Sequence, residues 1–159
     1  MTASGPGGWV ATFAWVAVVL LYAALSSVWT AHDPGWYARL AKPSFQPPDV
    51  VFGVVWPLNF LALLGVGVWF TRSAAAAAVW PATLVLAGSA VAALAWAWLF
   101  YVPHRIGAAT VALAVAAVLT WVLVALVVRS LPWAGVALVP YAVWLSVATA
   151  LSVQYSRLN

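Results

Sequence analysis

Five long apolar stretches make up most of this 159-residue sequence. They cover residues 9–30, 50–71, 80–101, 106–128 and 133–155. A transmembrane helix needs about 20 predominantly apolar residues, so each stretch is long enough to cross a bilayer. Strands of a membrane barrel instead alternate polar and apolar residues in segments of about ten. We therefore expect an all-α integral membrane protein whose single domain, residues 1–159, is a bundle of five transmembrane helices.

The scarcity of charge excludes most other classes of protein. Only 5% of the residues are charged, whereas the share in a soluble domain is about a quarter. The absence of Cys excludes disulfides and thiolate metal sites. Asp33 and Asp49 are the only acids, so we expect no bound metal and no firm catalytic residue. The net charge of +4 comes from scattered basic residues, which indicates membrane topology rather than a nucleic-acid surface.

The connection at residues 31–49 is the only long one between the apolar stretches. It holds both acids and four of the ten prolines, and loops of this length are uncommon unless they are functional. The other connections are short, so we expect successive helices to be antiparallel neighbours. The alanine run at residues 74–78 is interpreted as the helical start of the third span.

The basic residues predict the orientation of the bundle. Four of them fall on the side of the long connection and the C-terminus, and two fall on the other side. The four are Arg39, Lys42, Arg105 and Arg157, and the two are Arg72 and Arg129. Because basic residues favour the cytoplasmic side, we expect the connection and the C-terminus in the cytoplasm and the N-terminus outside. Residues 2–8 lack the basic residues of a signal peptide, so the first stretch is interpreted as an uncleaved helix.

Of the 12 tryptophans, Trp36 lies in the long connection and the other 11 fall into two groups according to their predicted depth. Tryptophans at span ends are expected to be interfacial anchors, and these are Trp9, Trp29, Trp69, Trp80 and Trp133. The deeper ones are Trp15, Trp56, Trp96, Trp98, Trp121 and Trp144. Several deep indoles converge in the half of the bundle beneath the long connection. This pattern fits an aromatic-lined cavity for a flat apolar ligand, and it fits aromatic core packing equally well.

Two spans carry further patterns of small residues and prolines. One face of the fifth span alternates large and small side chains: Ala137, Tyr141, Trp144, Ala148, Leu151 and Tyr155. Its alanines either admit another helix or leave room for a ligand. Pro57 lacks the amide hydrogen that would bond to the Gly53 carbonyl. Pro140 likewise leaves the Val136 carbonyl without its helical hydrogen bond. Each freed carbonyl needs a ligand or a neighbouring Ser or Thr as its partner.

The polar residues of the long-connection side leave several roles open. His32 and His104 could bind a haem iron, with a solvated loop histidine as the alternative. Arg39 and Lys42 could pair with the two acids, attract anionic groups at a cavity mouth, or anchor the connection at the membrane surface.

Two blocks of residues carry a resemblance to a known family. The first block is Trp36-Tyr37-x-x-Leu40-x-Lys42-Pro43-x-Phe45-x-Pro47-Pro48, followed by Phe52-x-x-x-Trp56. The second is Pro140-Tyr141-x-x-Trp144 with Ala148, preceded by Trp96-x-x-Leu99-Phe100-Tyr101 and Trp133-Ala134-Gly135. With these blocks the sequence resembles the TspO/MBR family, the tryptophan-rich sensory proteins related to the mitochondrial translocator protein. The match covers the chain from about Trp36 to the C-terminus.

The resemblance implies a five-helix bundle, usually a homodimer, with a cavity beneath the first loop that binds porphyrins. In animal members the cavity also binds cholesterol and benzodiazepine-type drugs. Some bacterial members are reported to degrade protoporphyrin in light. Carried over by position, the residues implicated in that reaction are Trp56 and Trp144. Ala148 occupies the position that affects ligand and sterol binding in the family.

The sequence departs from the family pattern at four positions. Ala93 and Ser152 stand where the family commonly has Asn. Phe60 stands where a tyrosine is often found, and Phe45 replaces the usual loop tryptophan. Losing two amides within the membrane removes polar contacts for a ligand or between helices.

From these residues and this resemblance we expect a membrane protein that binds a tetrapyrrole and acts in the transport, sensing or regulation of porphyrins. Porphyrin or haem is the expected ligand, and no cofactor is required. The macrocycle is expected to enter under the long connection and to stack on indoles. The expected ligand-binding residues are Trp36, Phe45, Trp56, Trp96, Tyr141, Trp144 and Ala148, with Arg39 and Lys42 at the rim. The alternatives are a light-dependent porphyrin-degrading enzyme that uses Trp56 and Trp144, a transporter or binder of a sterol or carotenoid, and a bundle without a ligand.

The third span carries small residues at a spacing of four, which is typical of helix contacts in membranes. They are Gly88 with Ala92, and Ser89 with Ala93 and Ala97. This stripe could serve within the bundle or between the protomers of a homodimer.

Overall fold

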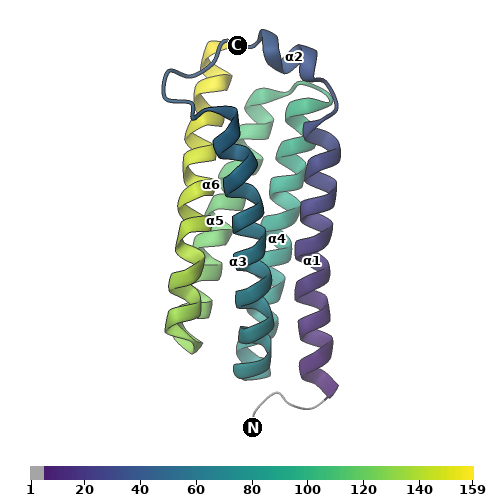
Figure 1. Ribbon diagram of the computed structural model, residues 1–159, viewed down its shortest axis with the longest axis vertical. Helices are drawn as coiled ribbons and strands as arrows, with labels where there is room; N and C mark the ends of the chain where they lie inside the picture. The colour runs from purple at the N-terminus through teal and green to yellow at the C-terminus, as the bar shows by residue number, and fades with distance from the viewer. Residues whose placement is uncertain (1–5) are drawn as a thin grey trace.

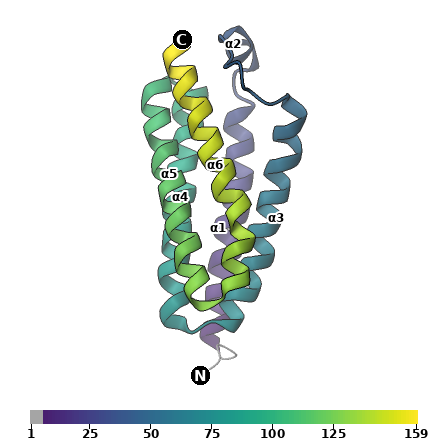
Figure 2. The same ribbon diagram turned by 90° about the vertical axis from the view of Figure 1, so that its left-hand side faces the viewer.

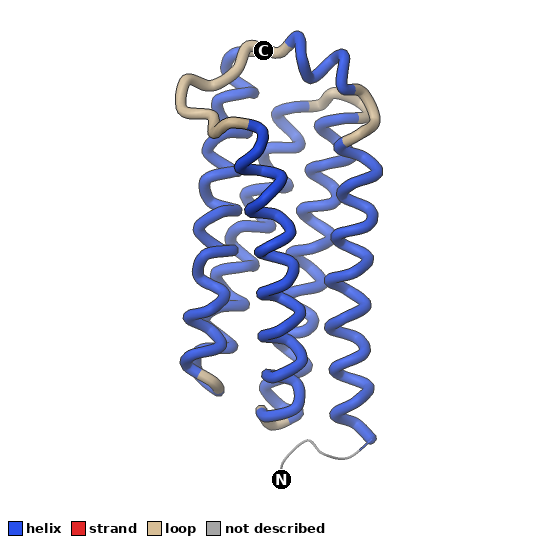
Figure 3. The backbone as a smooth tube through the Cα atoms, viewed as in Figure 1, coloured by secondary structure: helices blue, strands red, loops and turns tan. Residues whose placement is uncertain are grey.

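The structure is a computed structural model that describes residues 6–159. Five long helices run along the same axis, and one short helix lies across one end of the bundle (Figures 1 and 3). The helices are α1 (Pro6–Thr30), α2 (Pro34–Arg39), α3 (Asp49–Ser73), α4 (Ala76–Tyr101), α5 (Ile106–Ser130) and α6 (Pro132–Leu158). All five long helices are long and apolar enough to cross a membrane, which confirms the predicted fold class. Of the N-terminal flank at residues 2–8, residues 2–5 lie outside the described part of the chain.

The long helices extend slightly beyond the apolar stretches. The third span begins within the alanine run, as predicted. Helix α4 starts at Ala76, four residues before the apolar stretch at 80–101. Alanine is the best helix former, so it needs no apolar neighbours to extend a helix. At the other ends, Arg72, Arg129 and Arg157 lie in the last turns of α3, α5 and α6. A cation there interacts favourably with the carbonyl end of the helix dipole.

The order of the helices around the bundle is α1, α4, α5, α6 and α3, with α3 next to α1 again. The prediction that successive spans are neighbours is therefore right for three pairs and wrong for α3 and α4, which barely contact each other. Figure 2 shows α3 standing apart from α4. The physical reason is that α1 packs against both α3 and α4, so the short connection joins two helices that then separate.

The contact between α1 and α3 depends on Trp15 and a glycine notch. Trp15 is fully buried, and its indole N–H donates to the Leu63 carbonyl over 2.9 Å. The indole occupies the space beside Gly67, where an added Cβ would lie 1.9 Å from Nε1. The Thr12 and Thr71 hydroxyls also share a hydrogen bond of 2.8 Å. Both hydrogen bonds join the halves of α1 and α3 that lie away from α2.

One row of the small-residue stripe of α4, that of Ser89, Ala93 and Ala97, is used inside the protomer. Ser89 is fully buried, and its hydroxyl contacts the Ala116 carbonyl and the Thr120 hydroxyl of α5 at 3.0 and 2.8 Å. Ala93 and Ala97 are buried as well. This row therefore serves packing within the bundle, and it offers no surface to a second protomer.

The connection at residues 31–49 contains helix α2, where the sequence analysis expected only a loop. Asp33 is its N-cap, because the carboxylate Oδ1 accepts from the Trp36 amide over 2.9 Å. Pro34 occupies the first turn, where its missing N–H is not needed. An Asp-Pro pair before an aromatic segment is a recognisable start of a helix.

Candidate functional site

A cavity of about 480 Å³ lies in the half of the bundle beneath α2. Ligand pockets have volumes of roughly 300–1,000 Å³, so this cavity is large enough for a small organic ligand. Its walls come from α1, α3, α4 and α6, with one residue of α5 and two of the α2 connection. The lining comprises Tyr22, Ala23, Ser26, Ser27, Thr30, Tyr37, Gln46, Asp49, Phe52, Gly53, Trp56, Pro57, Phe60, Ala93, Trp96, Ala97, Phe100, Tyr101, Leu113, Ala148, Leu151, Ser152 and Tyr155.

Two aromatic clusters form opposite walls of the cavity. On α3, the rings of Trp56 and Phe60 stack at 5.9 Å with an interplanar angle of 28°, and Tyr22 of α1 packs edge-on against both. On α4, the Trp96 ring packs against Phe100 at 5.8 Å. Aromatic faces of this kind suit a flat ligand, because stacked rings gain attraction beyond the area that they bury.

Small residues leave the space between these walls. Ala93 and Ala97 of α4 and Ala148 of α6 all line the cavity. Of the two roles open to the α6 alanines, leaving room for a ligand is therefore the one that the geometry supports at Ala148. At Ala93 the amide expected from the family pattern is replaced by a methyl group. Ser152 also lines the cavity, but its hydroxyl is engaged with Thr110 Oγ1 of α5 at 2.8 Å.

The C-terminus of α6 holds the α2 connection over the cavity. The Asn159 side chain bonds to both backbone groups of Ala41, accepting from its N–H at 2.8 Å and donating to its carbonyl at 3.2 Å. The Tyr155 hydroxyl contacts Gln46 Oε1 and lies 3.2 Å from the Tyr37 hydroxyl. The sequence pattern alone predicts no role for Asn159, Gln46 or Tyr37. No local signal reveals these pairs, because their partners are more than a hundred residues apart.

A second attachment joins α2 to the connection between α4 and α5. The imidazole of His104 stacks on the Trp36 indole at 4.0 Å and 18°, and its Nε2 lies 3.7 Å from Asp33 Oδ2. His104 has a φ of 57°, which is unfavourable for a residue with a side chain. The contacts with Trp36 and Asp33 compensate for this strain. His104 therefore attaches α2 to the connection between α4 and α5. Asp33 pairs with this histidine, a partner that the sequence analysis did not consider.

We expect Asp33→Ala to loosen α2 without unfolding the bundle. The change removes both the N-cap bond to Trp36 and the carboxylate beside His104. Loss of an N-cap costs about 1 kcal/mol, so amide exchange in α2 should accelerate by roughly fivefold. Hydrogen–deuterium exchange measures this segment directly. Asp49→Ala, which removes the other acid, is the control and should leave α2 unchanged. Equal exchange in wild type and Asp33→Ala would show that the Asp33 carboxylate has no role in holding α2.

The predicted ligand residues separate into those that line the cavity and those that do not. Trp56, Trp96 and Ala148 line it. Trp144 lies behind Phe52, with its ring 5.4 Å from that phenyl ring. Tyr141 is fully buried in the core. Trp36 packs on His104 and Phe45 is 48% exposed, so neither reaches the cavity wall in this arrangement.

The two basic residues predicted for the rim lie outside the cavity lining. Lys42 is the nearer one, because its Nζ lies 5.6 Å from the centre of the Tyr37 ring, and Tyr37 does line the cavity. Arg39 is exposed on α2. The charged side chain that lines the cavity is Asp49, at the first turn of α3. Within residues 6–159, neither basic residue forms an ion pair with an acid.

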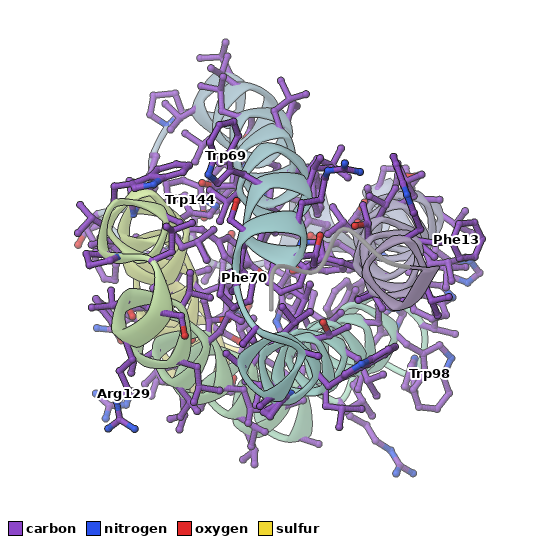
Figure 4. The ribbon with its side chains drawn as sticks, turned by 90° about the horizontal axis from the view of Figure 1, so that it is seen from below. Phe13, Trp69, Phe70, Trp98, Arg129 and Trp144 are labelled. Atoms are coloured by element: carbon purple, nitrogen blue, oxygen red, sulfur yellow. The ribbon has the colours of Figure 1, made fainter. Side chains whose placement is uncertain are left out.

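Two tryptophans that the sequence groups with the deep indoles face outward. Trp98 is 45% exposed and Trp121 is 42% exposed. Figure 4 shows Trp98 and Phe13 pointing away from the bundle, while Phe70 points toward its centre. The indole of Trp121 finds a partner in the Ser146 hydroxyl at 3.1 Å, which allows it to lie on the lipid-facing surface.

Four buried polar atoms have no hydrogen-bond partner among residues 6–159. They are Asn59 Nδ2, Trp96 Nε1, Tyr141 Oη and Trp144 Nε1. Three of them belong to the predicted ligand residues, and all four can donate. Burying an unpaired donor costs about 1–3 kcal/mol, so a hydrogen-bond acceptor that reached these atoms would add stability.

Comparison with known proteins agrees with this architecture. The sequence model of the TspO/MBR family matches residues 7–158. The chain is 34% identical to the tryptophan-rich sensory protein of Cereibacter sphaeroides, over 78% of this chain and 77% of that protein. It is 30% identical to protein CrtK of Rhodobacter capsulatus, over 80% and 81%. It is 35% identical to the human translocator protein, over 74% and 70%.

Proposed function

Since the chain belongs to the TspO/MBR family and is an integral multi-pass membrane protein, we propose that it binds a tetrapyrrole in the cavity beneath α2. The observation that carries this proposal is the aromatic wall of Trp56 and Phe60 facing space left by alanines. A planar macrocycle gains both apolar burial and stacking in such a site. Membership of the family and the names of the relatives support the coarser role of a membrane protein that binds or transports apolar ligands.

Binding is the mechanism that the side chains support best. The cavity lining is mostly apolar and aromatic, and Asp49 is its one carboxylate among residues 6–159. A propionate of the ligand would find its cation in Lys42, beside Tyr37 at the mouth. Oxidation of the porphyrin by light and tryptophan is the alternative reaction. It would rely on Trp56, because Trp144 is separated from the cavity by Phe52.

The same apolar walls would accept a sterol or a carotenoid, which is the second candidate ligand class. The two classes differ in what they gain from the site. A porphyrin gains from aromatic stacking on Trp56, whereas a saturated sterol gains from burial of apolar area. Competition between the two at one site therefore ranks them.

We also propose an orientation and an assembly. The α2 connection and the C-terminus would face the cytoplasm, because four of the six basic residues lie at that end. A homodimer would have to use an outer surface other than the Ser89 row, which is buried within the protomer.

The direct test is a titration of the protein in lipid nanodiscs with protoporphyrin, followed by quenching of tryptophan fluorescence. We expect the double variant Trp56→Leu and Trp96→Leu to bind protoporphyrin at least about tenfold more weakly. Stacking of a planar ring on an aromatic side chain is worth about 1–3 kcal/mol per side chain. The matched control is Trp98→Leu and Trp121→Leu, which also removes two tryptophans but from the outer surface. Quenching in wild type no larger than in empty nanodiscs, or equal affinity in both double variants, would contradict the proposal.

A further inference from the structure

The cavity is bounded by the α2 connection at one end and is open toward the side of the bundle. Four residues line the cavity and are also exposed: Ser27 and Thr30 of α1, and Gly53 and Pro57 of α3. All four lie within helices that are apolar enough to span a membrane. Figures 1 and 3 show α1 and α3 on the same face of the bundle, with no helix in front of the space between them. We call this opening between Ser27, Thr30, Gly53 and Pro57 the side opening.

The way in which α1 is fixed to α3 explains where this opening lies. Within the described chain, the hydrogen bonds between the two helices are those of Thr12 and Trp15. Both lie in the half of the bundle away from α2. Toward α2 the aromatic contacts between the two helices are those of the Tyr22 ring, which packs on Trp56 and Phe60. Beyond Tyr22, the last two turns of α1 have no such attachment to α3.

The chemistry of the side opening suits the passage of a flat molecule. Gly53 carries no side chain, and a Cβ added there would meet nothing within 4 Å. Pro57 lacks the N–H that would otherwise bond to the Gly53 carbonyl, which leaves an acceptor at the edge of the cavity. Facing it, Ser27 and Thr30 donate to carbonyls of their own helix. Small side chains and carbonyl acceptors therefore border the opening.

The route under α2 is closed by bonds, in contrast. Asn159 holds Ala41, Tyr155 contacts Gln46, and His104 stacks on Trp36. Entry there requires that the attachments of the connection at both ends of α2 break. Entry through the side opening breaks none of these attachments, because the hydrogen bonds between α1 and α3 lie in the other half of the bundle.

We infer that the cavity is loaded sideways from the bilayer, between α1 and α3, by a flat amphiphile already dissolved in the lipid. The inference rests on the proposed function for the identity of that ligand. It replaces entry under the long connection, which the sequence analysis expected. Gly53 is the residue that keeps the passage open, because it offers the only side-chain-free position among the residues that border it.

The test compares two glycines of α3. Gly53→Phe places a ring at the side opening, and Gly65→Phe places one on the exposed surface outside the cavity lining, where a Cβ also meets nothing within 4 Å. Nanodiscs preloaded with protoporphyrin, and in parallel with a fluorescent sterol, are mixed rapidly with nanodiscs that contain the protein. We expect Gly53→Phe to slow both association and dissociation by at least about tenfold, because it obstructs the path, and we expect Gly65→Phe to associate and dissociate at the wild-type rates.

Asn159→Ala provides the opposite test. It releases the connection from α6, so it should accelerate loading if ligands enter under α2 and leave the rates unchanged if they enter from the side. Side loading is wrong if Gly53→Phe binds the probes at the wild-type rate. It is also wrong if Asn159→Ala raises the rate of association. Slow loading of the sterol by Gly53→Phe, with no protoporphyrin bound by wild type, would retain the side opening and contradict the tetrapyrrole proposal. Binding of neither probe by wild type would overturn both.

Discussion

Replacing Gly67 by leucine is expected to break the contact between α1 and α3. Even the first added carbon would lie 1.9 Å from the Trp15 indole nitrogen, so the buried ring must leave its place. The displaced indole also loses its hydrogen bond to the Leu63 carbonyl. Displacement of a buried tryptophan costs on the order of 3–5 kcal/mol. Thermal unfolding of the purified protein should show this as a large fall in the midpoint temperature, or as failure to accumulate in the membrane.

Gly65→Leu is the control on the same helix, since its Cβ would meet nothing within 4 Å. In a helix a residue other than glycine is favoured by up to about 1 kcal/mol, so this variant should be as stable as wild type or slightly more stable. Trp15→Ala combined with Gly67→Leu separates the mechanisms. If the clash causes the loss of stability, Gly67→Leu should cost much less in the Trp15→Ala background, where the indole is gone. Equal stability of the two glycine variants would show that Trp15 can move freely, against the packing described above.

Filling the cavity should abolish ligand binding while the bundle stays folded. Ala148 of α6 lines the cavity, so Ala148→Trp places an indole in the space that a flat ligand would occupy. We expect at least about a hundredfold loss of protoporphyrin affinity, because overlap with the ligand cannot be relieved without displacing a helix. Fluorescence titration measures the affinity, and thermal unfolding checks that the fold is retained.

The matched control for this variant is Ala150→Trp, on the same helix but exposed on the outer surface. It should bind as wild type does, because a tryptophan there meets lipid. If Ala148→Trp keeps its affinity, the ligand binds elsewhere. If both variants lose affinity, a general effect on α6 is responsible, and the cavity would not be the site.

The candidate site was predicted in part from sequence. Trp56, Trp96 and Ala148 line the cavity. Their positions along the helices place them in the half of the bundle beneath the long connection, as the sequence predicts. Trp144 and Tyr141 share that face of α6, yet a phenyl ring and the core separate them from the cavity. Tyr22 of α1 and Phe60 of α3 complete the wall and were not predicted as ligand residues. Their roles depend on how α1 packs against α3.

The sequence by itself determined that the chain crosses the membrane five times and that one connection is long. Both properties are local, because about 20 consecutive apolar residues can satisfy their backbone hydrogen bonds in lipid only as a helix. The tertiary structure decided the order of the helices around the bundle and the direction in which each face points. Lipid tails are as apolar as leucine, so the inward and outward faces of a membrane helix have no contrast in hydrophobicity that a sequence could reveal. Trp96 and Trp98 are two residues apart and therefore lie on nearly opposite faces of α4. The packing of α4 against its neighbours decides that Trp96 lines the cavity and that Trp98 faces outward.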